Sequence, residues 1–435
     1  MRSQPPNLSA AIAHAEERQA EVTASLATRR TDLPLRYWRQ QAHFTTPAAD
    51  ETMARKAIEA GTAPMARLLD RFGVTAAELA AHLAVEAGPV ERLLEAPARA
   101  PLVMLDGEDA QALRDDVREA GLAAAARLLL SADWSGDGPP TLRFFRPTGF
   151  NLGTTVHDLY DLLSSLAADA GGREVPLDGI VFPKLEHPEE VDLLYEILER
   201  AEESFSLPSG QIRVAFLIES AWAAAQLPEI ARRATGRLCG LIFGLADYSA
   251  DVGLSQIAND HPLADWARAQ IVNVCGAVGV PAIDGMTLDY PVRDPALDDA
   301  ANRSRFLERM KLVYTDAVRA RDFGMQGKWV GHPAQLFATL LAFEEGFAPE
   351  ALEQEAAKIE AYRVSVDEEG RGATIIGGVM SDRATDRHAR GRLRQAVAVG
   401  RFDAERAARL GIVTRDEMEP PARIEPPGRK EGEAG

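Results

Sequence analysis

Two acidic residues, Glu219 and Asp247, stand where consecutive apolar segments of the sequence end. Glu219 closes the run IRVAFLIE, and Asp247 follows the run LCGLIFG. If these runs are neighbouring parallel strands, both carboxylates lie on one edge of the sheet, where they would repel each other unless a cation lay between them. Mg²⁺ binds through few carboxylates and leaves positions open for substrate oxygens. We therefore predict that Glu219 and Asp247 bind Mg²⁺ or Mn²⁺ together with a substrate, although either acid alone could instead cap the helix that follows it.

A third apolar run ends in an acidic cluster. The segment LVMLDGEDA contains Asp106, Glu108 and Asp109 directly after its apolar residues. We expect these carboxylates to orient an arginine or metal-bound waters. The alternative is a loop cluster that caps the next helix.

Cationic side chains follow two further runs. TLRFFRPTG offers Arg143 and Arg146, and we prefer Arg146 because Pro147 ends the strand and Gly149 opens a loop there. A guanidinium at this position could hold a carboxylate or stabilise a developing oxyanion, whereas a surface ion pair is the simpler alternative. Lys184 ends the run GIVFPK, and we expect it to contact the substrate rather than to form a Schiff base, because the metal offers another route to a stabilised enolate.

The elements that must position these residues are short apolar runs that alternate with amphipathic stretches. Near-continuous apolar runs are typical of strands that are buried on both faces, and the intervening stretches are long enough for crossover helices. Eight such runs predict a closed (β/α)₈ barrel, with an open doubly wound sheet as the alternative. The runs lie at residues 42–46, 102–106, 141–146, 179–184, 212–219, 238–244, 280–284 and 328–333.

The rest of the chain suggests helical additions to this barrel. We expect a helical N-terminal region over residues 1–100, with the first strand near 42–46, and a barrel over residues 101–345. Residues 346–416 are expected to form a helical segment that serves as a lid or in oligomerisation. The tail 417–435 is rich in Pro, Glu and Gly and is expected to be disordered.

Composition excludes several classes of partner. The net charge of −18 over 435 residues disfavours nucleic acid and anionic membranes, because both require clustered Lys and Arg. No secretory signal and no apolar run of membrane-spanning length is visible, and the two cysteines lie in apolar segments. We therefore expect a cytoplasmic protein with buried thiols.

Taken in order, these segments resemble the HpcH/HpaI aldolase / citrate lyase family, in particular its citrate lyase β-subunit-like and malyl-CoA lyase-like members. The resemblance covers roughly residues 101–345. It rests on LDGEDA (105–110), Arg146 followed by Asp158-Leu159, Pro183-Lys184, Ile218-Glu219-Ser220, Gly244-Leu245-Ala246-Asp247, PAIDG (281–285) and GKWVGHPAQ (327–335).

The resemblance implies a Mg²⁺-dependent carbon–carbon lyase that cleaves a malyl-CoA- or citryl-CoA-like hydroxyacyl substrate by a retro-Claisen or retro-aldol reaction. Glu219 and Asp247 would be the metal ligands, and Arg146 would stabilise the enolate oxygen. The segment VMSDRATDRHA resembles a stretch whose aspartate acts as acid and base, often from a neighbouring subunit, which points to Asp382. The resemblance also implies a homo-oligomer, either a trimer or a hexamer.

Three departures from the family pattern keep other functions open. LDGEDA and RPTG differ from the usual turns, and the helical N-terminal region is not usual. The alternatives are an aldolase on a free 2-oxo acid, a malyl-CoA thioesterase and a barrel that binds a metabolite without turnover.

Overall fold

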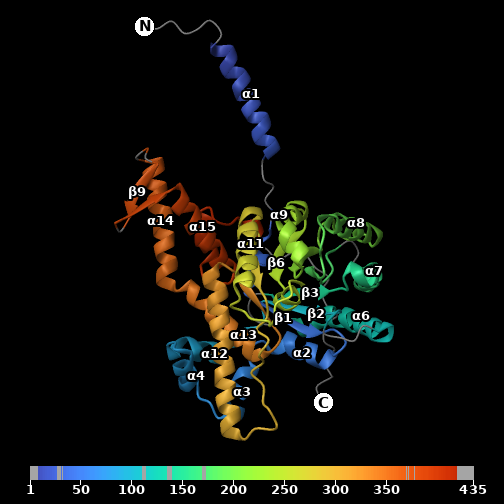
Figure 1. The fold of residues 1–435 in the computed structure, drawn as a ribbon. Coiled ribbons are helices and arrows are strands. Elements are labelled where there is room, and N and C mark those ends of the chain that lie inside the picture. The colour runs from blue at the N-terminus through green and yellow to red at the C-terminus, as the bar shows by residue number, and fades with distance from the viewer. Residues whose placement is uncertain are drawn as a thin grey trace.

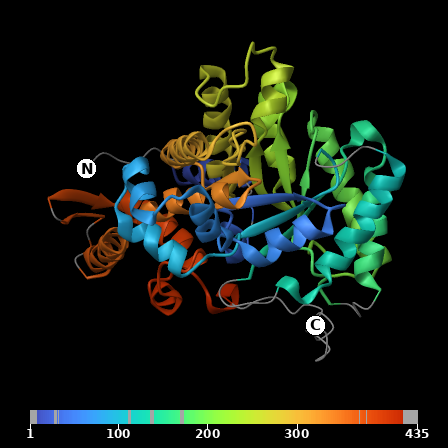
Figure 2. The same cartoon turned by 90° about the horizontal axis from the view of Figure 1, so that it is seen from below.

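Eight parallel strands form a closed barrel at the centre of the computed structural model, which describes residues 8–26, 31, 33–109, 114–134, 140–168, 173–368, 370, 372–376 and 378–418. Each strand pairs with its neighbours in sequence, and the last pairs with the first, as expected for a (β/α)₈ barrel. Figure 2 shows the strands at the centre with helices around them. The predicted fold class is thereby confirmed. The strands are β1 (Ala42–Pro47), β2 (Leu102–Asp106), β3 (Leu142–Arg146), β4 (Gly179–Phe182), β5 (Arg213–Ile218), β6 (Leu238–Phe243), β7 (Ala282–Asp284) and β8 (Gly327–Val330).

Helices follow the strands on the outside of the barrel. Their apolar faces pack against the strands and form one continuous core with them. The crossover helices are α6 (Asp115–Leu129), α7 (Thr155–Ala167), α8 (Pro188–Ser204), α9 (Ala221–Ala234), α10 (Leu245–Asp251), α11 (Pro262–Val278), α12 (Asp299–Phe323) and α13 (Pro333–Glu344).

The strand register decides which side chains point into the barrel. Side chains alternate along a strand, and residues paired across neighbouring strands point the same way. Arg146 pairs with Asp106, and His43 pairs with Trp329, whose ring lies beneath the Arg146 guanidinium at 5.4 Å. These four side chains therefore face the barrel interior.

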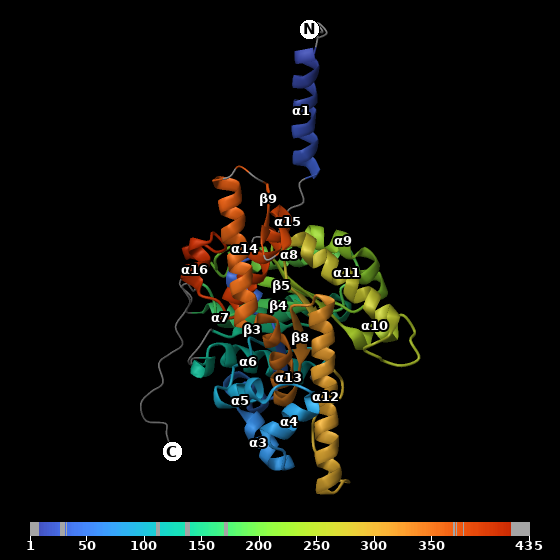
Figure 3. The same cartoon turned by 90° about the vertical axis from the view of Figure 1, so that its left-hand side faces the viewer.

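Four helices lie between β1 and β2, within the N-terminal region expected to be helical. They are α2 (Glu51–Ala60), α3 (Pro64–Phe72), α4 (Ala76–Leu83) and α5 (Ala87–Glu95). Thr75 and Glu78 form the capping box that starts α4. The Phe72 ring stacks on Phe306 of α12 at 4.3 Å, so this insertion packs on the outer layer of helices. A further helix, α1 (Leu8–Leu26), extends away from the barrel in Figures 1 and 3.

The C-terminal segment forms an arm and a smaller core. The arm consists of α14 (Pro349–Asp367), the antiparallel strands β9 (Ala373–Ile376) and β10 (Val379–Asp382), and α15 (Arg383–Ala398). Helices α16 (Ala404–Arg409) and α17 (Arg415–Met418) follow. The core of this segment packs around Leu35 in the 3₁₀ helix η1 (Leu35–Trp38), which precedes β1. The segment therefore covers the end of the barrel where the strands begin.

The structure describes only the first two residues of the predicted C-terminal tail, residues 417–435. Glu417 and Met418 belong to α17 and not to a disordered tail, because the Thr414 hydroxyl and the Glu417 carboxylate cap this turn. The rest of the tail, residues 419–435, lies outside the described residues. Among the described helices, none is both long and apolar enough to cross a membrane.

Candidate active site

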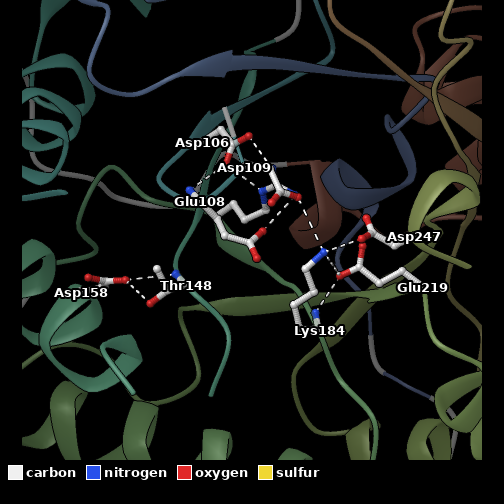
Figure 4. A network of polar contacts seen from close by, with 9 residues as sticks. Asp106, Glu108, Asp109, Thr148, Asp158, Lys184, Glu219 and Asp247 are labelled. Carbon is white, nitrogen blue, oxygen red and sulfur yellow. Dashed lines mark hydrogen bonds and ion pairs between the residues drawn. The ribbon is translucent and has the colours of Figure 1, made fainter. Parts of the chain in front are cut away.

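Arg146 is held by a shell of carboxylates at the mouth of the barrel, where the strands end. Its Nε and Nη2 donate to the two oxygens of Asp106 at 2.7 and 2.5 Å. Its Nη1 lies 3.2 Å from Glu108 and 3.4 Å from Asp109. The ring of Trp329 closes the other side. The three acids predicted to orient an arginine are thus brought together around Arg146 (Figure 4).

Burial and the neighbouring charges together set the protonation states of Arg146 and Glu108. Burial alone would lower the pKa of Arg146, but Asp106, Glu108 and Asp109 together raise it above its ordinary value. Burial also raises the pKa of Glu108 to about 7, although Arg146 opposes this shift. Arg146 is therefore a fixed cation, and Glu108 can change its protonation state near neutral pH.

Lys184 connects the arginine to the two predicted metal ligands. Its ammonium lies 2.9 Å from Asp247, 3.6 Å from Glu219 and 3.7 Å from Asp109, and Figure 4 shows these side chains converging. Its backbone N–H also donates to Glu219 at 2.7 Å. Lys184 adopts a left-handed conformation with φ of 53°, which is uncommon for a residue with a side chain.

Glu219 and Asp247 can therefore reach a common cation, because both contact the same ammonium nitrogen. Glu219 comes directly after β5 and is 3% exposed, while the Asp247 side chain in the first turn of α10 is 49% exposed. Burial raises the pKa of Glu219 to about 8, against the opposing effect of Lys184. One ammonium thus compensates this buried carboxylate only in part, and a divalent cation would compensate it better.

The donor set suits a hard cation that keeps open positions. Among the described residues, no group of three or more His, Cys, Asp or Glu side chains could hold a metal. Two carboxylates at a mouth open on one side match Mg²⁺, which usually takes one or two carboxylates and completes its shell with water and substrate oxygens. Such a pair does not form the closed set of ligands typical of a structural zinc site.

Lys184 is charged and not an amine nucleophile. Burial would lower its pKa, but Glu219, Asp247 and Asp109 outweigh this effect and raise the pKa above its ordinary value. A Schiff-base lysine needs the opposite shift. Lys184 is therefore suited to bind an anionic group.

Two glycines allow the strand ends to approach so closely. A Cβ added at Gly244 would lie 2.4 Å from the Cβ of Glu219, so only glycine fits between β6 and this carboxylate. A Cβ added at Gly149 would lie 3.1 Å from the Cβ of Lys184 and 3.2 Å from the carbonyl of Pro183. These contacts link the loop after Arg146 to the position of Lys184.

The turn after Arg146 is fixed by residues to which the sequence assigned no such role. Asp158 in α7 accepts hydrogen bonds from the Thr148 backbone N–H at 3.0 Å and from the Thr148 hydroxyl at 2.6 Å (Figure 4). Arg118 of α6 pairs with the other oxygen of Asp158 at 2.9 Å. The sequence signal for Asp158 was its position at the start of a helix in the family pattern. The signal for Trp329 was the alternation of side chains along its strand, which predicts the side chains that face the barrel interior.

Other candidate residues lie apart from the mouth. Arg143 points outward, where it stacks on Trp134 and donates to the carbonyl of Leu129. His332 caps α13 through its ring nitrogen. Asp382 caps α15, where its carboxylate accepts hydrogen bonds from the backbone N–H groups of Ala384 and Thr385.

Comparison with known proteins shows the family to which this chain belongs. The chain matches the family described as "Domain of unknown function (DUF6986)" over residues 34–425. An L-malyl-CoA/beta-methylmalyl-CoA lyase of Cereibacter sphaeroides is 30% identical over 320 residues, which cover 69% of this chain and 89% of that protein. A lyase of the same name from Haloarcula marismortui is 30% identical over 219 residues, which cover 50% of this chain and 60% of that protein.

A solved structure shares the fold. The crystal structure of a citrate lyase from Burkholderia xenovorans LB400 matches with a TM-score of 0.57 and 22% identity, covering 85% of this chain and 96% of that chain. The match to the Haloarcula protein spans less than two thirds of its length, so similarity along the whole of that relative is not implied. The chain belongs to the DUF6986 family and, with it, to the HpcH/HpaI aldolase / citrate lyase family.

Proposed function

We propose that this protein is a divalent-metal-dependent carbon–carbon lyase that cleaves a malyl-CoA- or citryl-CoA-like hydroxyacyl thioester. The observation that carries the proposal is the convergence of Glu219 and Asp247 on one cation position, beside an arginine that is held rigidly by carboxylates. The malyl-CoA lyases among the relatives support the class of substrate.

Each side chain has a distinct task in this proposal. Glu219 and Asp247 would hold Mg²⁺ or Mn²⁺, which would polarise the hydroxy or oxo oxygen of the bound substrate. Lys184 would bind a carboxylate of the substrate. Asp106, Glu108 and Asp109 would keep Arg146 oriented towards the thioester.

Bond cleavage begins with removal of the proton from the substrate hydroxyl. The carbon–oxygen bond becomes a carbonyl as the bond to the neighbouring α-carbon breaks, and the electron pair of that bond passes to the thioester as an enolate. Arg146 donates hydrogen bonds to the enolate oxygen, and a proton delivered to the α-carbon completes the second product. Arg146 suits this task because its charge is fixed and its position does not change during the reaction.

The proton acceptor is proposed to be Asp382 of a second copy of the chain. Within one chain Asp382 ends β10 of the arm and caps α15, where it contacts Ala384 and Thr385 and not the mouth residues. An arm that reaches a neighbouring barrel would supply it, and this requires a homo-oligomer such as a trimer or hexamer. Mixing inactive Asp382→Asn protein with inactive Glu219→Gln protein should restore part of the activity if the residue acts between subunits.

The test is turnover of purified protein with malyl-CoA, with glyoxylate and acetyl-CoA measured separately. We expect both products with Mg²⁺ and neither after chelation, and we expect Glu219→Gln and Asp247→Asn to be inactive. Asp70→Asn, on the exposed surface of α3, is the matched control and should retain full activity.

Other outcomes would replace the proposal. Release of free CoA without glyoxylate would indicate a thioesterase. Turnover of free 2-oxo acids without a thioester would indicate an aldolase. Full activity in the presence of chelator would refute the metal site.

A further inference from the structure

A cavity lies at the end of the barrel opposite the candidate active site. It has a volume of about 600 Å³ and opens between the beginnings of the strands and the C-terminal segment. We call it the basal cavity, and its walls include Leu35 of η1, Leu142 of β3, Val397 of α15, Ala404 of α16 and Met418 of α17. Sites for small molecules commonly have 300–1,000 Å³ and largely apolar walls.

One cation in this cavity has no partner. Arg39 follows η1 and is half-buried, and among the described residues its guanidinium makes no hydrogen bond or ion pair. Burial lowers the pKa of Arg39 to about 10, although Asp178 opposes this shift. Its neighbour Arg36 differs, because it lies 3.4 Å from Asp178 and 3.7 Å from Glu174. Asp178 already pairs with Arg36 and acts on Arg39 from beyond ion-pair distance, which marks Arg39 as the group that an anion entering the cavity would contact.

The acidic residues of the cavity are engaged elsewhere or exposed. Asp178 accepts the backbone N–H of Arg143 at 2.9 Å and faces Arg36. Glu417 pairs with Arg394, which lies outside the lining. Asp416 is exposed to solvent. Arg39 is therefore left without a direct acidic partner among the described residues.

We propose that the basal cavity binds a small amphipathic carboxylate, with its carboxylate at Arg39 and its aliphatic part against the apolar walls. One guanidinium matches one carboxylate through two parallel hydrogen bonds. The site is separate from the lyase site, and the proposal does not depend on the reaction at the mouth.

A ligand in this position would join two parts of the molecule. One wall belongs to the barrel, through η1 and β3, and the other belongs to α15, α16 and α17. A ligand that binds only the folded protein stabilises it in proportion to its occupancy. Binding should therefore raise the Tm and slow hydrogen exchange at the end of α15.

The experiment compares hexanoate with hexan-1-ol, acetate and inorganic phosphate by calorimetry and thermal unfolding of the full chain. We expect saturable binding and a rise in Tm with hexanoate alone. Arg39→Gln should abolish the effect, Arg39→Lys should weaken it, and Ala404→Phe should abolish it by filling the cavity. Arg71→Gln, an exposed change on α3, and Glu219→Gln at the mouth should leave it unchanged.

The position of the ligand is checked with 6-bromohexanoate in crystals. The proposal requires bromine in the basal cavity and the carboxylate within hydrogen-bond distance of Arg39. Bromine at the mouth beside Lys184, equal binding of hexan-1-ol, an unchanged response in Arg39→Gln, or no response in the wild type would each overturn it.

Discussion

Two clusters of charged residues at the strands of this barrel contain similar types of residue, but they differ in how fully their charges are compensated. The mouth cluster consists of Arg146 and Lys184 with Asp106, Glu108, Asp109, Glu219 and Asp247. The outer cluster consists of Arg268 and Lys328 with Asp284, Asp316 and Asn259, and lies between β7, β8 and the helices that cover them. Both contain an arginine, a lysine and carboxylates at strand ends, so composition does not distinguish them.

Hydrogen bonding does distinguish them. In the outer cluster, Asp284 accepts from Arg268 at 2.7 Å and from Lys328 at 2.9 Å, and Lys328 also donates to the carbonyl of Gly285 at 2.6 Å. In the mouth cluster, one oxygen of the buried Glu108 lies 3.2 Å from the Arg146 guanidinium but accepts no hydrogen bond from the described residues, and the side chains of Asp109 and Asp247 are about half exposed.

The pKa values of the central carboxylates, Asp284 and Glu219, express the same difference, although burial also raises the pKa of Asp316 in the outer cluster. Burial would raise the pKa of Asp284, but Lys328 and Arg268 outweigh it and hold that pKa below its ordinary value. Burial raises the pKa of Glu219 to about 8. A buried charge cluster whose members satisfy one another maintains the fold, whereas one that leaves carboxylates undercompensated is prepared for a ligand.

The largest expected effect is on the outer cluster. Asp284→Asn removes the ion-pair partner of the buried Lys328 and leaves Arg268 with Asp265 as its acidic partner, so the free energy of unfolding should fall by about 3–5 kcal/mol. Urea unfolding measures this loss, and Asp322→Asn, at an exposed ion pair, should change stability by less than about 1 kcal/mol. A loss as small as that of the control would remove the distinction between the clusters.

The corresponding change in the mouth cluster should affect activity instead. Glu219→Gln should lower metal-dependent turnover by about 10²–10³-fold. Stability at pH 7 should hardly change, because burial already favours the neutral form of Glu219 and the amide oxygen can still accept from the backbone of Lys184. Turnover and urea unfolding on the same preparation check both halves of this prediction. A loss of several kcal/mol in stability would assign Glu219 to the fold.

Gly244→Ala tests how tightly the mouth cluster is positioned. The added methyl would lie 2.4 Å from the Cβ of Glu219, so we expect a loss of about 1–3 kcal/mol in stability and weaker Mg²⁺ binding by calorimetry. Gly391→Ala in α15 is the control, since its Cβ meets nothing within 4 Å. That change should leave Mg²⁺ binding unaltered and raise stability slightly. Unaltered Mg²⁺ affinity in Gly244→Ala would show that Glu219 can move freely.

His43 tests whether buried polar side chains without hydrogen-bond partners are also present in the barrel interior below the mouth cluster. Neither ring nitrogen has a partner among the described residues, and burial lowers the pKa of His43 to about 3. The unfolded chain gains this proton near pH 6.5 while the folded chain does not. Stability from this group is therefore present above pH 6.5 and falls by about 1.4 kcal/mol per pH unit towards pH 3.

His43→Leu should remove this contribution to acid sensitivity, as measured by urea unfolding between pH 7 and pH 4.5. The exposed change His157→Leu should leave the pH dependence as in the wild type. An unchanged slope in His43→Leu would mean that the imidazole takes up its proton in the folded state.

The barrel could be predicted from sequence because its strands are nearly continuous apolar runs. Six of the eight predicted runs contain the observed strands, and β1 and β8 each extend one residue beyond their predicted runs, at Pro47 and at Gly327. The pairing of Glu219 with Asp247 followed from the rule that parallel strands end on one edge. Residues 373–382 of the C-terminal segment form a two-stranded hairpin, because a turn at Gly378 in a left-handed conformation reverses the chain.

The remaining features depend on geometry that no local pattern encodes. The position of the Lys184 ammonium follows from a left-handed backbone at a residue that is not glycine. The Asp158–Thr148 contact requires the folded loop. The segments PAIDG and GKWVGHPAQ contain the same types of charged residue as the mouth motifs. Asp284 and Lys328 nevertheless point outward, and only the strand register determines the direction of these side chains.

The alternation of side chains in β5 also limits where the length of this protein can change. Deleting one residue within β5 would turn Glu219 out of the barrel and bring an apolar neighbour into its place. The number of residues in the strand is therefore constrained, even at positions where the type of residue is not. The four helices between β1 and β2 are inserted at the end of a strand, where additional residues do not change which side chains of the strand face the barrel interior. Engineered insertions and domain fusions should therefore be tolerated at such junctions and fail inside the strands, whatever amino acids they contain.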